Sequence, residues 1–221
     1  MISSTTSSPN SNSAGAGPRR LLLIRHGHTE CFETGLAARD DPLSATGKAQ
    51  AAHLSASSAR SLSAVSQVTT VLVSPLARAL ETALIIFGNR SDVTLHVHPL
   101  LREFNMNQKE KDNLIKTYPR HVGSQIAELQ LRFPASNYMC RVVWDELPGG
   151  DWWVPHGDAF KLSSFFPRRF PSSIDDDSAV PTCTDRCKQL LAAIHGGAFS
   201  CSGPLAIVAH ENVFRVMAGM M

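Results

Sequence analysis

Three short polar segments of the sequence combine arginine and histidine in a way that suits phosphate chemistry. They are RHGHT at residues 25–29, SPLAR at residues 74–78 and HEN at residues 210–212. An arginine side chain presents a planar fork of N–H donors that matches phosphate oxygens two at a time. A neutral imidazole is a competent nucleophile toward phosphorus near pH 7, because its ordinary pKa is about 6.5. Together the segments predict a phosphate site with a histidine that can attack phosphorus.

Each polar segment directly follows a run of apolar or β-branched residues that is typical of a buried strand. The runs are 21–24, 70–73 and 205–209, and unbroken apolar runs of this length characterise parallel strands that are covered on both faces. In open parallel sheets, ligands bind outside the carboxyl ends of the strands. We therefore expect the three polar segments to meet in one crevice.

Strand and helix patterns alternate along most of the chain. Besides the three strands, the sequence predicts a strand near 93–97 and helices over 46–60, after Pro75, over 183–195 and over 212–219. Ser74 and Pro75 suit the N-cap and the first helical position of the helix that follows them. The alternation predicts an α/β fold, a doubly wound sheet with helices on both faces in three layers.

The 221 residues fit one domain that carries an insertion. Residues 1–18 are rich in Ser, Asn and Gly, so we expect a disordered tail before a single domain over 19–221. An organelle transit peptide is the alternative for this tail. Between about 104 and 180 the alternating pattern dissolves, and this stretch holds all three tryptophans. We interpret it as an insertion, a flap over the carboxyl ends of the strands.

Composition and charge narrow the class of protein further. The chain is 43% hydrophobic and 18% charged, which suffices for a core and argues against wholesale disorder. Its net charge of +2 gives no global field that would attract nucleic acid. No apolar run approaches the ~18 residues of a membrane span, and five scattered cysteines suit reduced thiols. We therefore expect a cytoplasmic protein with no nucleic-acid or membrane partner.

Five stretches of the sequence, in this order, resemble the motifs of the histidine phosphatase superfamily, also called the phosphoglycerate mutase-like family. They are LLIRHGHT at 22–29, DPLS at 41–44, SPLARA at 74–79, LRE at 101–103 and VAH at 208–210. The resemblance spans residues 20–215, apart from the insertion. It implies the phosphoglycerate mutase-like form of the α/β fold.

The resemblance also implies a role for each residue that matches a motif. The implied catalytic residues are His26, the nucleophile that forms a phosphohistidine, Glu103, the general acid, and His210. The implied phosphate-binding residues are Arg25, Arg78 and Thr29, and His210 would also hold phosphoryl oxygens. Preorganised cations of this kind contribute strongly to such chemistry. No metal and no cofactor are implied, and the expected partner is a small phosphorylated molecule or a phosphoprotein.

Several positions depart from the family pattern. Phe32 stands where many members have Asn, Glu81 where Gln is common, and Glu211 where Gly often follows the last histidine. The glycine-containing stretch after the acid is also missing at 104–107. A carboxylate at 211 is unfavourable beside a phosphate unless it points away or pairs with a cation. These changes favour hydrolysis of a phosphomonoester over phosphoglycerate mutase activity, and the intact motif residues argue against a catalytically weak binding or scaffold protein.

Two further features have open interpretations. Trp144 and DWW at 151–153 would form either a satellite core that anchors the insertion or an aromatic wall for an apolar or planar substrate group.

Only eleven residues follow His210, so we expect a short terminal helix and an incomplete domain. The sheet face that this helix would leave uncovered should lower the thermal stability or cause association of the protein through that face. The sequence leaves the substrate and the oligomeric state open.

Overall fold

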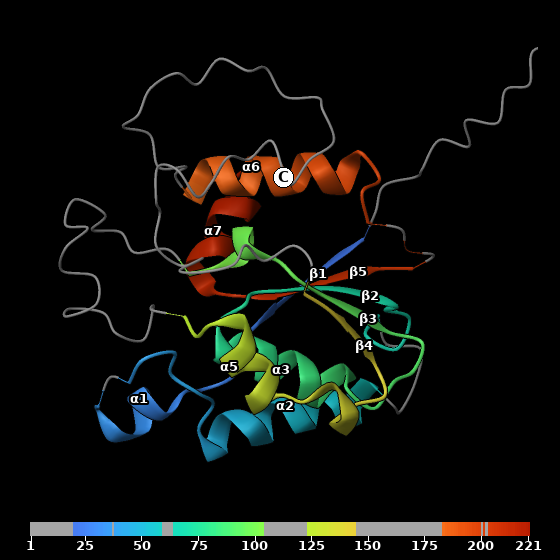
Figure 1. Ribbon diagram of the computed structural model, residues 1–221. Helices are drawn as coiled ribbons and strands as arrows, with labels where there is room; N and C mark the ends of the chain where they lie inside the picture. The colour runs from blue at the N-terminus through green and yellow to red at the C-terminus, as the bar shows by residue number, and fades with distance from the viewer. Residues whose placement is uncertain are drawn as a thin grey trace, which may run out of the picture.

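The computed structural model describes residues 20–36, 38–58, 64–103, 123–144, 183–199, 201 and 203–221. Figure 1 shows a central sheet with helices on both of its faces. The expected tail at residues 1–18 lies outside the described residues. Within the described part of the chain, no helix combines the length and the apolar character that crossing a bilayer requires.

Five parallel strands form the sheet, in the order β1-β5-β2-β3-β4. Their bounds are β1 Leu21–Arg25, β2 Thr70–Val73, β3 Thr94–Val97, β4 Arg141–Val143 and β5 Leu205–Ala209. Every residue of β2 and β5 is buried, as expected for strands covered on both faces. The three strands that precede the polar segments are β1, β5 and β2, and they are direct neighbours in the sheet.

Two layers of helices cover the sheet (Figure 1). The helical elements are α1 Glu30–Thr34, α2 Ala45–Ser58, α3 Ala77–Phe87, η1 Pro99–Leu101, α5 Ile126–Arg132, η4 Ala135–Asn137, α6 Cys183–His195 and α7 Glu211–Ala218. Helices α2, α3 and α5 lie on one face, and α6 and α7 lie on the other. The side chains of β2 point alternately to the two faces of the sheet. Val71 and Val73 pack in the hydrophobic core that contains the buried residues of α3, and Leu72 packs in the core that contains those of α6. The predicted doubly wound α/β fold in three layers is confirmed.

The start of α3 differs from the sequence prediction, which makes Ser74 the N-cap. The helix begins at Ala77, with Leu76 as its N-cap residue in an extended conformation. The Ser74 hydroxyl oxygen accepts a hydrogen bond from the Leu76 N–H at 3.3 Å, whereas Oδ1 of Asp40 accepts one from the Ala77 N–H at 2.8 Å. The prediction of Ser74 as N-cap is therefore wrong, because a buried carboxylate from another segment takes that place. Burial raises the pKa of Asp40.

Part of the expected insertion belongs to the sheet. Residues 123–144 form α5, η4 and β4, and β4 pairs with β3 at the edge. The interpretation of 104–180 as one flap therefore does not hold for 123–144, while 104–122 and 145–180, with Trp152 and Trp153, lie outside the described residues. Because β4 has three residues and begins with an exposed arginine, its pattern is too short to recognise. Trp144, which follows it, packs against the core that contains α3.

Candidate active site

The three polar segments meet at one edge of the sheet, where β1, β5 and β2 end. The His26 N–H donates to the Ala209 carbonyl at 3.0 Å, and the Ser74 N–H donates to the Val208 carbonyl at 2.9 Å. These bonds extend the strand pairing just past the ends of β1 and β2. They bring His26, Ser74 and His210 together, as the strand-end argument predicts.

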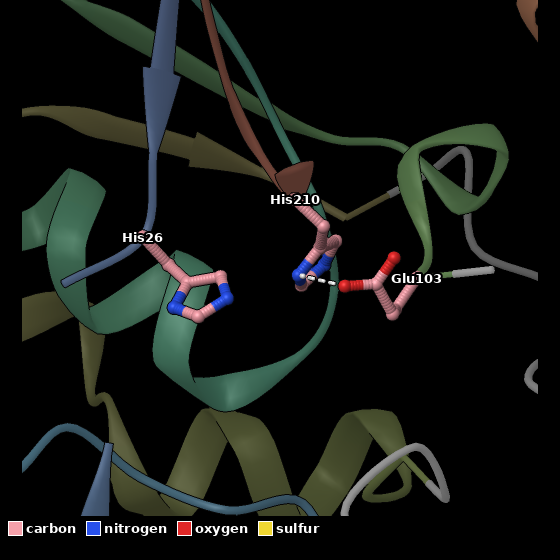
Figure 2. A group of neighbouring side chains, drawn as sticks. All are labelled: His26, Glu103 and His210. Atoms are coloured by element: carbon pink, nitrogen blue, oxygen red, sulfur yellow. Dashed lines mark ion pairs between the residues drawn. The ribbon is translucent and has the colours of Figure 1, made fainter. Parts of the chain in front are cut away.

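A cleft at this edge contains most of the residues that the sequence analysis singles out. It is lined by Arg25, His26, Thr29, Phe32, Asp41, Arg78, Glu103, Glu211 and Asn212. His210 adjoins the cleft: it is fully buried, and its ring centroid lies 5.1 Å from that of His26. The structure thus gathers all six predicted site residues in one place. Figure 2 shows His26, Glu103 and His210 approaching one another from three separate segments.

The ring of His26 is held through its Nδ1 atom. Nδ1 lies 2.8 Å from the Gly27 carbonyl oxygen, and because a carbonyl oxygen only accepts, Nδ1 carries the proton. In the neutral ring the lone pair is then on Nε2. A Cβ at Gly27 would come within 2.7 Å of the Gly47 carbonyl oxygen of α2, and the Gly27 N–H donates to Oγ1 of Thr82 on α3 at 3.1 Å. Two helices therefore fix the loop that carries His26.

His210 joins two other segments of the site. Its Nε2 lies 2.8 Å from Oγ of Ser74, and its Nδ1 lies 3.6 Å from Oε2 of Glu103 (Figure 2). Both side chains are shielded from water, since His210 is 0% and Glu103 10% exposed. This contact joins the residue that follows β5 to the segment that follows η1.

Glu103 is positioned by a residue that the sequence analysis missed. Nη1 of Arg186, on α6, donates to the carbonyl oxygens of Leu100 and Arg102, each at 3.0 Å. Arg186 is 2% exposed, so a buried guanidinium ties α6 to the turn that precedes Glu103. The helical spacing of the sequence could have indicated that Arg186 is buried. It stands four residues before buried Leu190 and thus on the apolar side of its helix.

Comparison with known proteins decides the family. The sequence profile of the Histidine phosphatase superfamily (branch 1) matches residues 21–136, more than half of the chain. The protein belongs to the histidine phosphatase superfamily. The matched residues include His26, Arg78 and Glu103. His210 lies beyond them, so its place in the site rests on the geometry.

The solved structures of several phosphatases are similar to this chain. The mycobacterial glucosyl-3-phosphoglycerate phosphatase in complex with VO3 matches with a TM-score of 0.50 and 19% identity, over 92% of this chain and 80% of that chain. Alpha-ribazole phosphatase from Shigella flexneri gives a TM-score of 0.46 and 19% identity, over 91% and 78%. Phosphoserine phosphatase from Entamoeba histolytica, in complex with 3-phosphoglyceric acid, gives 0.45 and 19%, over 90% and 77%. No curated protein matches the sequence itself.

Glu211, which stands where many superfamily members have Gly, is paired with two arginines. Its Oε2 lies 3.3 Å from Nη1 of Arg25, and its Oε1 accepts a hydrogen bond from Nη2 of Arg215. The Glu211 carboxylate therefore pairs with cations, as a carboxylate beside a phosphate-binding site must if it does not point away from it. A bound phosphoryl group would share Arg25 with Glu211, so the net attraction for an anion at this point is reduced.

Phe32 and Glu81, the other single-residue departures from the superfamily pattern, lie in different places. Phe32 lines the cleft, is 57% exposed, and has its ring centroid 5.6 Å from that of His28. The side chain of Glu81 contacts other residues. Its Oε2 accepts a hydrogen bond from the Leu43 N–H at 3.0 Å, and its Oε1 lies 3.3 Å from Nζ of Lys48. Of the three positions where this chain has a different residue from many superfamily members, Phe32 and Glu211 therefore line the cleft.

His26, Glu103 and His210 also form a group that could hold a metal ion. Each offers one ligand atom, and these atoms lie within 4.8 Å of one another. Arg25 and Arg78 line the same cleft, and two guanidinium groups oppose a cation and attract an anion. These two arginines can bind phosphoryl oxygens, and the carboxylates of Asp41, Glu103 and Glu211 line the same cleft.

Proposed function

We propose that this protein is a phosphatase that hydrolyses a phosphomonoester through a phosphohistidine on His26, without a metal ion. The observation that carries the proposal is the His26 ring, held at Nδ1 by the Gly27 carbonyl at 2.8 Å in a cleft lined by Arg25 and Arg78. Nε2 is then the nucleophilic atom, next to groups that attract a phosphate dianion. Membership of the histidine phosphatase superfamily supports the same chemistry.

In the first step, the lone pair of His26 Nε2 forms a bond to phosphorus while the bond between phosphorus and the ester oxygen breaks. The electron pair of that bond stays on the ester oxygen, which takes a proton from the Glu103 carboxyl group and leaves as an alcohol. Arg25, Arg78 and the Thr29 hydroxyl stabilise the charge on the phosphoryl oxygens.

In the second step, a water molecule attacks the phosphorus of the phosphohistidine and gives a proton to the Glu103 carboxylate. The bond between phosphorus and Nε2 breaks, and its electron pair returns to the ring. The products of the two steps are one alcohol and one orthophosphate for each water consumed. His26 and Glu103 return to their starting states, with His210, 3.6 Å from Glu103, beside the proton that is transferred.

The acceptor of the phosphoryl group distinguishes a phosphatase from a mutase. In a mutase, the hydroxyl of a second phosphorylated molecule would take the place of water. Glu211 adds a negative charge to the cleft, and Phe32 puts an aromatic ring there, so an anionic acceptor is disfavoured. These two residues support hydrolysis as the reaction.

The test is orthophosphate release by the purified protein from phenyl phosphate and from a panel of phosphometabolites and phosphopeptides, with and without a metal chelator. We expect release that the chelator leaves unchanged and that His26→Ala abolishes. His195→Ala, a matched change of an exposed histidine at the end of α6, should retain full activity. Activity that survives His26→Ala, that needs a metal ion, or that transfers phosphate only to a second phosphorylated alcohol would contradict the proposal.

A further inference from the structure

Asp41 is held in the cleft by one of its two carboxylate oxygens. It lines the cleft and is 1% exposed, and its Oδ1 accepts a hydrogen bond from the Cys31 N–H at 3.1 Å. The next residue is fixed as well, because the Pro42 carbonyl accepts from the Glu30 N–H at 3.1 Å. The position of this carboxylate is therefore set by the backbone around it.

The second oxygen of Asp41, Oδ2, is buried and has no hydrogen-bond partner among the residues that the structure describes. The adjacent Asp40 provides the contrast, since its two oxygens accept from the Ala77 N–H at 2.8 Å and from the Ser124 N–H at 3.1 Å. A buried carboxylate oxygen without a donor destabilises the folded protein. A ligand that supplies a donor at this point would therefore gain affinity.

The phosphoryl group is a poor partner for this oxygen. At neutral pH its oxygens act as acceptors, and its negative charge is repelled by a carboxylate. Arg25 and Arg78 line the same cleft and draw the phosphoryl group to themselves. The other part of the substrate, the alcohol that leaves, can supply the donor that Asp41 Oδ2 lacks.

We infer that Asp41 is a specificity residue whose Oδ2 accepts a hydrogen bond from an O–H or N–H donor on the leaving group. The substrate is accordingly the phosphomonoester of a diol, a polyol or an amino alcohol, and not of a simple aliphatic alcohol. Because a buried acceptor left unsatisfied is costly, the site discriminates against analogues without the donor. This inference rests on the proposed phosphatase activity.

The test compares wild type with Asp41→Asn and Asp41→Ser on matched esters. Phosphoethanolamine, 2-hydroxyethyl phosphate and 3-hydroxypropyl phosphate carry a donor, whereas ethyl and propyl phosphate carry none. The amide of Asp41→Asn can still accept from the Cys31 N–H but presents N–H groups to the cleft, and Asp41→Ser removes the carboxylate with a smaller side chain. Each variant is compared with wild type on the same ester, so differences in leaving-group reactivity cancel.

We expect both variants to lower kcat/KM by about 10- to 100-fold for esters that carry the donor, as for a hydrogen bond to a charged group. For ethyl, propyl and phenyl phosphate, which carry no donor, the loss should be smaller, so that the ratio of kcat/KM between matched esters falls in both variants. If the hydroxyalkyl phosphates lose activity in the variants, the donor on the leaving group is a hydroxyl; if phosphoethanolamine does, the donor is an ammonium group. Asp92→Asn, a matched change at an exposed residue paired with Arg90, should leave every ratio unchanged.

Two failures can be told apart. If wild type hydrolyses phenyl phosphate but the Asp41 variants change all esters by the same factor, the specificity inference is overturned and the proposed function stands. If wild type releases phosphate from none of the esters, phenyl phosphate included, the proposed function itself is contradicted. If wild type hydrolyses ethyl phosphate as well as its hydroxylated counterpart, the inference is overturned without any variant.

Discussion

At the scale of single residues, hydrogen bonds decide which atom of each histidine is available for chemistry. The Gly27 carbonyl holds Nδ1 of His26 at 2.8 Å, and Oγ of Ser74 lies 2.8 Å from Nε2 of His210. Nδ1 of His210 is thereby directed to Glu103 at 3.6 Å (Figure 2). The two rings thus lie in different surroundings, and in the proposed mechanism His26 would attack phosphorus through Nε2 while His210 lies beside Glu103.

We predict that Glu103→Gln slows esters with poor leaving groups far more than activated aryl phosphates. An alkoxide needs the proton that Glu103 supplies, whereas a nitrophenolate leaves without one, and general acid catalysis typically contributes ~10²–10⁴-fold. The measurement is kcat/KM on an alkyl phosphate and on p-nitrophenyl phosphate. Glu30→Gln, at an exposed position of α1, is the matched control and should change neither. Equal losses on both substrates would assign Glu103 a positional role only.

The sequence predicts some residues of the site and misses others for a physical reason. His26, Arg78 and Glu103 stand in or beside strand-end motifs, so their convergence follows from the parallel sheet. Arg186 and the unsatisfied oxygen of Asp41 acquire their roles from contacts with distant segments. Such contacts have no local pattern, because a buried charge and a solvated one look alike in the sequence.

At the scale of elements, η1 and α6 together support Glu103, the proposed general acid. His98 is the N-cap of η1, and its Nδ1 accepts from the Leu100 N–H at 3.2 Å. Arg186 of α6 holds the carbonyl of the same residue, Leu100, and that of Arg102. Burial lowers the pKa of His98 to about 4, and the neighbouring His96 acts in the same direction. The folded protein therefore prefers the neutral His98 ring.

We predict that part of the stability is lost as pH falls from about 6.5 to about 4. The unfolded chain protonates His98 near the ordinary pKa, whereas the folded chain does so only near the lowered one. Within this window the unfolded state binds more protons, so the free energy of unfolding decreases, by up to about 3 kcal/mol at the acid end. Denaturant unfolding across the window measures this loss.

The control for this prediction is His98→Asn, which keeps an acceptor for the Leu100 N–H and removes the titration. Other groups titrate alike in both proteins, so the difference between the two pH profiles isolates His98. We expect the variant to lose less stability than wild type over the same window. Parallel profiles would contradict the assignment of the loss to His98.

Most elements could be predicted from hydrophobic patterning, and the exceptions are instructive. Strands β2 and β5 have the expected bounds of 70–73 and 205–209, because four or five buried apolar or β-branched residues in a row leave a clear signal. β4 has only three residues and one exposed arginine, which is too little. The cap of α3 comes from Asp40, a tertiary contact that local propensity does not encode.

At the scale of the whole molecule, the parallel sheet gathers chemistry from both ends of the chain. β5 lies between β1 and β2, so a histidine from near the amino end meets one from near the carboxyl end at the same edge (Figures 1 and 2). The fold class and the place of the site could be predicted because both depend on buried strands and their ends, and the family because five motifs of the sequence resemble those of the superfamily. The role expected for the remainder of the 104–180 insertion stays a prediction.

The most direct test of the account is to identify the covalent intermediate. The enzyme is quenched during turnover of a phosphate-labelled ester, digested, and its labelled peptide mapped. We predict a phosphoryl group on His26 that is labile to acid and stable to base, as a phosphoramidate bond requires, and that disappears in His26→Ala. Label on a cysteine, a serine or another histidine, or turnover with no labelled protein at any time, would contradict the central claim that His26 is the nucleophile.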